Sequence, residues 1–200
     1  MTVFRTREVA IALSIACGAV SSTGCTTHRS PPVPGSYSFK RMADGREWLT
    51  ENVNVNVAGS YCYQDDELMC RRYGRLYTWG AAQRACRSLQ GGWRLPTDEE
   101  WRLLAKPYGG AHGDSADDGK SAYASLLKGG NSGFDALLGG GRAPDRNDYD
   151  RLEAHGFYWT ASESGPPSAV FFNFGSGGQA LHRQPEGEKP RAFSVRCVRG

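Results

Sequence analysis

Four cysteines in the body of the chain limit the folds that it can adopt. They are Cys62, Cys70, Cys86 and Cys197, and their spacing contains no C-x-x-C pair or neighbouring histidine of the kind that zinc sites use. In an exported domain, four cysteines imply two disulfides, and three connectivities are possible. We predict a local Cys62–Cys70 bond and a long Cys86–Cys197 bond. In the chain-entropy model the long bond contributes on the order of 4 kcal/mol to the free energy of unfolding, more than the short one.

The first 25 residues have the pattern of a bacterial signal peptide. Two arginines precede an apolar run over residues 9–20, which is too short for a stable transmembrane anchor. The Ser-Thr-Gly-Cys ending resembles a lipobox, in which Cys25 is lipidated and becomes the mature N-terminus. Ser22 stands where leucine is usual, and Glu8 lies unusually close to the apolar run. The alternative is ordinary cleavage near the small residues, with Cys25 unmodified.

We expect residues 1–25 to be a lipoprotein signal peptide with Cys25 as the lipidation site. Since no second hydrophobic segment follows, the lipid would be the membrane anchor. Thr26 follows the cysteine where retained lipoproteins have Asp, which by resemblance suggests the outer membrane or cell surface. Three prolines in residues 26–38 favour an extended tether, and residues 39–200 have the length of one domain.

Composition and local patterns predict a loop-rich α+β domain. The chain has 26 glycines and a net charge of +3 with acids and bases interspersed, so nothing suggests nucleic acid binding. The Asp44-Gly45 pair predicts a hairpin. A helix is expected over Trp79–Leu89, and a shorter helix or turn over Ser121–Lys128.

One helix start is unusually clear. Thr97 and Glu100 form a capping-box pattern, and Trp101 and Leu104 would face the core. The acidic residues 98–100 suit the positive end of that helix, so we interpret them as helix chemistry and not as a catalytic carboxylate pair.

Patterns typical of catalysis or metal binding are weak elsewhere. The histidines at 28, 112, 155 and 182 lie on unrelated segments, which suggests no catalytic triad. Residues 139–141 (Gly-Gly-Gly) are interpreted as a tight corner, because they do not match a phosphate-binding motif. The acidic run 145–150 lacks the glycine and glutamate of a calcium-binding EF-hand loop. We therefore expect no metal and no cofactor.

Five ordered blocks resemble a known family. They are YGRLYTWGAA (73–82), GWRLPTDEEW (92–101), GFDALLGGGR (133–142), GFYWTASE (156–163) and SVRCVR (194–199). In this order and spacing they resemble the Fibrobacter succinogenes major paralogous (FISUMP) domain, over essentially all of residues 39–200. That family is similar to the formylglycine-generating-enzyme branch of the C-type lectin-like fold.

The resemblance implies a particular scaffold. It implies two main helices, short antiparallel strands, long loops, and a disulfide from the first helix to the last strand, which is the same Cys86–Cys197 pairing. One departure is that many relatives carry a cysteine beside the GWRLP motif, whereas Cys86 lies earlier, inside the helix.

The resemblance also implies a ligand-binding face in the last strands and loops. The segment from Tyr158 to Gly200 mixes small, apolar and polar residues without clear periodicity. Trp159 and Phe174 would belong to the framework, and the mixed positions between them would be displayed. The expected ligand-binding residues, among which the apolar ones would be exposed, are Ser164, Pro167, Ser168, Val170, Phe171, Asn173, Ser176, Leu181, His182 and Arg183.

Many proteins of this fold are variable proteins of diversity-generating retroelements. In these elements, adenines in a template copy are randomised into the 3′ end of the gene, chiefly at Asn codons. The residue types in this segment are those that such changes produce, although ordinary surface substitution in a fixed sequence is an alternative. The expected function is that of a lipid-anchored, exported binding protein for an external protein or glycan, without catalysis. The alternatives are an enzyme or accessory of the formylglycine-generating kind, disfavoured because no spare thiol remains, and a structural envelope lipoprotein.

Overall fold

The computed structural model describes residues 37–144 and 148–200. The expected signal peptide, Cys25 and most of the expected tether lie outside these residues, as does the first half of the acidic run, residues 145–147. The described residues form a mixed α+β fold with two disulfides, as predicted. Among them, none of the helices has the length and apolar character needed to cross a membrane.

The helices agree closely with the sequence patterns. Helix α2 spans Trp79–Ser88, one residue shorter than predicted, and α4 spans Lys120–Leu126 within a turn of the predicted position. The other helical segments are α1 Glu67–Tyr73, α3 Asp98–Ala105 and the short 3-10 helices η1 Tyr63–Asp65 and η2 Lys106–Tyr108.

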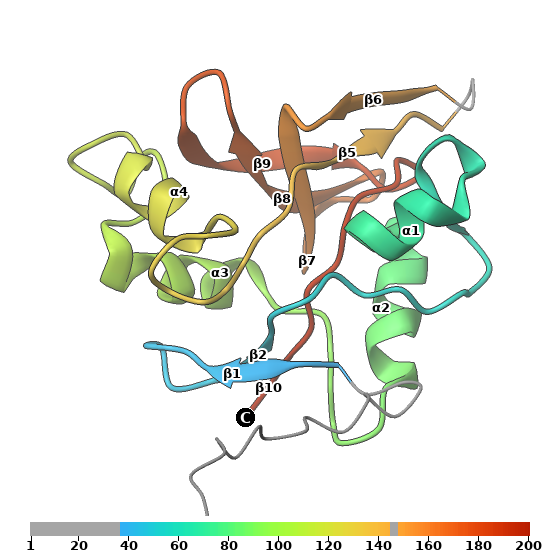
Figure 1. The fold of residues 1–200 in the computed structure, drawn as a ribbon, viewed down its shortest axis with the longest axis horizontal. Coiled ribbons are helices and arrows are strands. Elements are labelled where there is room, and N and C mark those ends of the chain that lie inside the picture. Colours follow the sequence, from blue (N-terminus) through green and yellow to red (C-terminus); the bar gives the residue numbers. More distant parts are fainter. Residues whose placement is uncertain (1–36, 145–147) are drawn as a thin grey trace, which may run out of the picture. The chain divides into compact units, whose positions relative to one another are not determined.

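The strands form three sheets (Figure 1). The largest sheet has the strand order β6-β5-β7-β8-β9, the second has the order β1-β2-β10, and β3 pairs with β4. The strands are β1 Phe39–Arg41, β2 Glu47–Leu49, β3 Ser60–Tyr61, β4 Leu76–Tyr77, β5 Gly139–Arg142, β6 Tyr149–Leu152, β7 His155–Gly165, β8 Ser168–Gly175, β9 Ala180–Glu188 and β10 Val198–Arg199. The predicted hairpin at Asp44-Gly45 joins β1 to β2.

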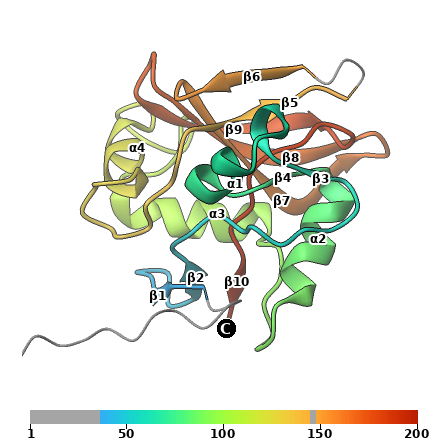
Figure 2. The ribbon, with the colours of Figure 1, turned by 45° about the vertical axis from the view of Figure 1, so that its right-hand side comes forward.

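The two faces of the large sheet pack against different helices. Tyr158, Phe172 and Phe174 share one hydrophobic cluster with buried side chains of α3 and α4. Trp159, from the other face, packs with the buried alanines of α2. Figure 2, seen beside Figure 1, shows α3 and α4 on one side of β7 and β8 and α2 on the other.

Helix α3 begins with the predicted capping box. The Thr97 hydroxyl accepts a hydrogen bond from the Glu100 amide, and the Glu100 carboxylate accepts one from the Thr97 amide at 2.9 Å. Burial opposes ionisation of Glu100, but hydrogen bonds from Arg94 and the Thr97 backbone, with the nearby charges of Arg94 and Arg46, lower its pKa to about 2. Trp101 on the next turn is fully buried. The acidic residues at this helix start thus serve local structure, as predicted.

One prediction for the later strands is wrong, and one strand was not predicted. Residues 139–141 are not a corner but lie in strand β5, between β6 and β7. Glycine is needed there because a Cβ at Gly140 would collide with the Asp150 carbonyl, and one at Gly141 would press on the rings of Phe157 and Phe193. The stretch that looks unpatterned also contains a full strand, β9, paired along its length with β8.

Arg196 is a fully buried cation held by oxygen atoms of the chain. Its guanidinium donates to the Asn52 side chain at 2.7 Å and the Leu49 carbonyl at 3.0 Å, and also to the carbonyls of Phe134 and Asp135. Burial lowers the pKa of Arg196. These bonds tie the last segment of the chain to the loops after β2 and α4, so Arg196 is part of the framework.

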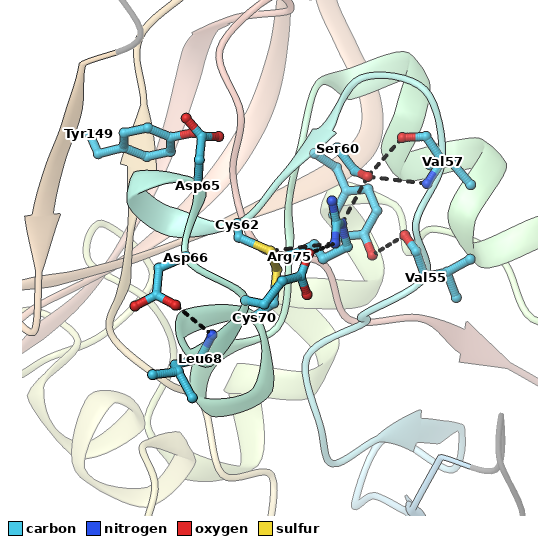
Figure 3. The surroundings of a disulfide bond; sticks show 12 residues. Val55, Val57, Ser60, Cys62, Asp65, Asp66, Leu68, Cys70, Arg75 and Tyr149 are labelled. Carbon is cyan, nitrogen blue, oxygen red and sulfur yellow. Dashed lines mark hydrogen bonds and ion pairs between the residues drawn. A yellow bond between two sulfur atoms is a disulfide. The ribbon is translucent and has the colours of Figure 1, made fainter.

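Both predicted disulfides are present. Cys86 of α2 is bonded to Cys197, immediately before β10, across a sequence separation of 111 residues. The Cys62–Cys70 bond joins the start of η1 to α1 (Figure 3). Arg75 lies against this second bond, with its guanidinium 3.4 Å from the Cys62 sulfur and 3.5 Å from the Glu67 carboxylate. The donor atoms of Cys62, Glu67 and Cys70 lie within 4.8 Å of one another, but both sulfurs are committed to the disulfide.

Candidate functional site: the outer face of the large sheet

Strands β7, β8 and β9 place alternate side chains on opposite faces of the sheet. The antiparallel register pairs Phe157 with Asn173 and Asn173 with His182, so these three side chains share one face. Phe171 lies two residues from Asn173 on the same face. We define the outer face as five partly exposed residues of this side: His155, Phe157, Phe171, Asn173 and His182.

One end of the outer face is rich in histidine. His155 is hydrogen-bonded to the Asn173 side chain at 2.9 Å. The ring of His112, from the loop after η2, lies 4.9 Å from that of His182, and its Nδ1 is 3.5 Å from the Asp118 carboxylate. Burial, followed by the proximity of His112, lowers the pKa of His182 below its usual 6.5. A neutral imidazole beside an amide provides both donors and acceptors for a polar ligand.

The other end of the outer face is aromatic. The rings of Phe157, Phe171 and Phe193 lie 4.9–5.9 Å apart and line a shallow cavity of about 270 Å³. Glu186 and Glu188, on the end of β9, form its rim together with Arg191. Between the two glutamates is Gly187, where a Cβ would collide with Phe171 and Trp159, so the backbone can lie directly against the rings.

The structure brings together some of the predicted ligand-binding residues and separates others. Phe171, Asn173 and His182 meet on the outer face. Three more, Ser164, Pro167 and Ser168, lie at the turn between β7 and β8, where the Ser164 hydroxyl donates to the Pro185 carbonyl. Ser176 lies beyond the other end of β8, so these residues do not form one continuous patch.

Two predicted positions are buried, so the expectation that they are exposed is wrong. Leu181 is completely buried in the cluster with α3 and α4, and Val170 is 3% exposed. Val170 lies at a bulge between Ala169 and Phe171, where the register shifts. Leu181 lies in the regular part of the ladder and is buried because its face of the sheet packs against α3 and α4. Neither side chain can contact a ligand without rearrangement of the core.

Arg183 points to α3 and not to the outer face. Its guanidinium makes a two-pronged ion pair with Asp98, with nitrogen–oxygen distances of 2.7–2.9 Å. The Asp98 backbone amide also donates a hydrogen bond to the Ser162 hydroxyl oxygen at 3.0 Å. The ion pair connects β9 to the start of α3, which gives Arg183 a structural role.

Sequence reasoning did not find the convergence of His112, His155 and His182. They come from a loop and two different strands, and only the strand register brings two of them to the same face. Residues 111–112 run beside β9, where the His112 amide donates to the Leu181 carbonyl at 2.8 Å. No local motif could reveal this, since each histidine is isolated in sequence.

Larger hollows occur elsewhere, and ion pairs bind some of their charged groups. One of about 320 Å³ is lined by Arg102 and Asp114, which bind each other at 2.8 Å. Another, of about 370 Å³, includes Arg94, which is bound to Glu100. A third, of about 340 Å³, carries acidic and basic residues in mixture around Asn52. The cavity of the outer face differs in being lined by the rings of three phenylalanines.

A comparison with models of protein families matches residues 37–199 to the Fibrobacter succinogenes major domain. Neither a curated protein nor a solved structure matches the chain significantly.

Proposed function

The chain belongs to the Fibrobacter succinogenes major domain family, and from this premise we propose that it is a binding protein. Its outer face would hold an external protein or glycan partner. The observation that carries the proposal is the in-register placement of Phe171, Asn173 and His182, partly exposed, on a sheet whose opposite face buries Tyr158, Phe172 and Phe174. Binding residues on a rigid framework need little ordering when a partner docks.

The framework around the outer face supports this role. Trp159 and Phe172, adjacent to Phe171 in the sheet, are completely buried, and the Trp159 indole donates to the Tyr77 carbonyl at 2.8 Å. The Cys86–Cys197 bond fixes α2 to the end of the chain. The buried core and this disulfide hold the strands that display the outer face.

We further propose that the scaffold is C-type lectin-like. A disulfide from a helix to the last strand region, and the antiparallel pairing of the C-terminal β10 with β2 near the start of the domain, support this assignment. If retroelement diversification acts on this chain, we expect it to vary Phe171, Asn173 and His182 and to spare Val170 and Leu181, which are core residues. Lipidation at Cys25, followed by a proline-containing tether, would hold the domain at the outer membrane or cell surface.

The alternative of an enzyme of the formylglycine-generating kind needs a reactive thiol. All four cysteines in the described residues are in disulfides, so this part of the chain offers none. The remaining alternative, a structural envelope lipoprotein, would not need a partly exposed aromatic and histidine face. The proposal therefore involves no catalysis and no cofactor.

The proposal is tested by screening the full chain, purified in detergent, on arrays of bacterial surface proteins and glycans. The test variant combines Phe171→Ala, Asn173→Ala and His182→Ala. The matched control combines Leu68→Ala, Arg87→Ala and Gln90→Ala, which are exposed residues that do not belong to the outer face. Binding that survives in the control and disappears in the test variant, with both variants folded by circular dichroism, is expected. Equal binding by the two variants would remove the outer face as the binding site.

A further inference from the structure

The cavity at the aromatic end of the outer face has an apolar floor. Phe171 and Phe193 lie 4.9 Å apart, Phe193 is also 4.5 Å from the buried Trp159, and Phe157 completes the group. At about 270 Å³ the cavity is below the range of roughly 300–1,000 Å³ that is usual for small-molecule sites. Its size suits one side chain of a partner better than a complete cofactor.

The rim of this cavity is negatively charged. In the described part of the chain, neither the Glu186 nor the Glu188 carboxylate has a hydrogen-bond or ion-pair partner. Arg191, the basic residue of the lining, is occupied by Asp150 at 3.7 Å and by the Phe193 ring at 5.8 Å. With two glutamates and one paired arginine, the lining of the cavity carries a net negative charge.

The nearest lysine does not neutralise these carboxylates. Lys189 donates to Glu163 at 2.7 Å and to the carbonyls of Gly165 and Pro166, while its ammonium lies 4.7 Å from the Trp79 ring centre. Lys189 thus combines an aromatic ring with a carboxylate partner. The cavity offers the same two groups, the phenylalanine rings and the glutamates, to a cation from outside the chain.

We propose that the cavity receives a lysine or arginine side chain of a partner protein. The apolar stem would lie on the phenylalanine rings, because long basic side chains cover apolar surface while their charge stays near water. The charged head would face Glu186 and Glu188 and gain from the electron-rich ring faces. This inference rests on the proposed binding function and specifies one contact within it.

The proposal distinguishes between the two partner classes named for the outer face. Neutral sugars also stack on aromatic rings, but they do not require two carboxylates at the rim. An acidic ligand would be repelled by Glu186 and Glu188, which remain unpaired in the described residues. A basic protein surface is the class that uses both features.

The direct test is a ¹H–¹⁵N NMR titration of the full chain in detergent with small mimics of side chains. n-Butylguanidinium and n-butylammonium represent arginine and lysine, and n-pentanoate and methyl glucoside serve as anionic and neutral sugar probes, all up to 50 mM at fixed ionic strength. We expect saturable shifts at the amides of Phe171, Gly187 and Glu188 with both cations. No shifts with the cations, or equal shifts with pentanoate or the sugar, would overturn the proposal.

Two double variants of equal charge test the contribution of Glu186 and Glu188 to cation binding. Glu186→Gln with Glu188→Gln should weaken butylguanidinium binding by at least roughly fivefold, as expected from the loss of exposed charge pairs. The control combines Glu67→Gln with Glu99→Gln, which changes the net charge equally on exposed residues away from the cavity and should leave binding unchanged. Equal weakening of butylguanidinium binding by both double variants would indicate that the net charge of the protein attracts the cation, and would refute a local site.

The outcomes separate this inference from the proposed function. If a partner found on the arrays requires Phe171, Asn173 and His182 but is indifferent to Glu186→Gln with Glu188→Gln, the binding face stands and the cation site fails. If the cations bind in the cavity while the outer-face triple variant retains all array binding, the cation site stands and the proposed function fails.

Discussion

Replacement of Arg196 tests the framework on which the outer face depends. The guanidinium makes hydrogen bonds to four oxygen atoms, from Asn52, Leu49, Phe134 and Asp135, and it is completely buried. Arg196→Ala removes the donors but leaves these oxygens in the interior. Because water cannot replace the lost donors without entering the core, the change should be far more severe than an average substitution.

The expected magnitude follows from the contacts. Breaking a buried charged arrangement by removing one partner costs about 3–5 kcal/mol, and a hydrogen bond to a charged group contributes about 1.5–3 kcal/mol. We expect Arg196→Ala to lower the free energy of unfolding by about 4 kcal/mol. Arg196→Lys keeps the charge, but an ammonium cannot reproduce the planar fork, so a smaller loss of about 1–3 kcal/mol is expected.

The assay is urea unfolding followed by tryptophan fluorescence, with disulfides intact and Arg87→Ala as the control. Arg87 is exposed on α2, and its removal should change stability by less than about 0.5 kcal/mol. Urea is chosen because it carries no charge. If the free energy of unfolding of Arg196→Ala lies within about 1 kcal/mol of that of the control, the oxygens around Arg196 do not stabilise the fold and the account of the framework is wrong.

Four further predictions concern single features of the chain. Leu181→Ala should destabilise the domain by about 2–5 kcal/mol in the same assay, and a loss below about 0.5 kcal/mol would contradict its place in the core. Cys197→Ser should cost roughly 2–5 kcal/mol and Cys70→Ser less, because the loop closed by Cys62–Cys70 is shorter; the reverse order would refute the entropic argument. Glu100 has a pKa of about 2 in the folded protein against an ordinary 4.5, so the stability that it contributes is complete above pH 4.5 and is lost as the pH falls toward 2. Glu100→Gln should flatten this part of the curve of stability against pH, and an unchanged curve would disprove the assignment. Cys25→Ser should release the protein from membranes in cell fractionation, whereas unchanged membrane association would exclude the lipid anchor.

Features that depend on neighbouring residues were accessible from the sequence. The capping box at Thr97 and Glu100 is one example, since it is complete within four residues. The hairpin at Asp44-Gly45 is another, because turn chemistry is local. The Cys62–Cys70 and Cys86–Cys197 bonds were predicted because few pairings were possible and because the family resemblance supported the second.

Features that depend on strand register were not accessible. Strand β9 is hidden because its two faces meet different surroundings: Leu181 is buried against α4, His182 is partly exposed, and Arg183 pairs with Asp98. No simple alternation of polar and apolar residues results, and a one-residue error in register exchanges the two faces. This is why Leu181 looked like a display position.

The oxygens around Arg196 and the histidine end of the outer face could not be predicted from the sequence for the same reason. The oxygens that bind Arg196 come from residues 61–147 positions away in sequence, and three of the four are backbone carbonyls. A backbone carbonyl is present at every residue, so the sequence carries no signal for which ones will converge. Such sites become visible only when the topology is known.

Site-specific photocrosslinking on living cells tests the binding role of the outer face most directly. A photoreactive p-benzoylphenylalanine is placed at Phe171 in the full chain, and at Leu68, a 59% exposed residue of α1, as the control. The account predicts a discrete crosslinked partner from position 171, absent from position 68, and lost when Asn173→Ala and His182→Ala are added. No adduct from position 171, or the same adducts from both positions, would contradict the assignment of this face as the binding surface.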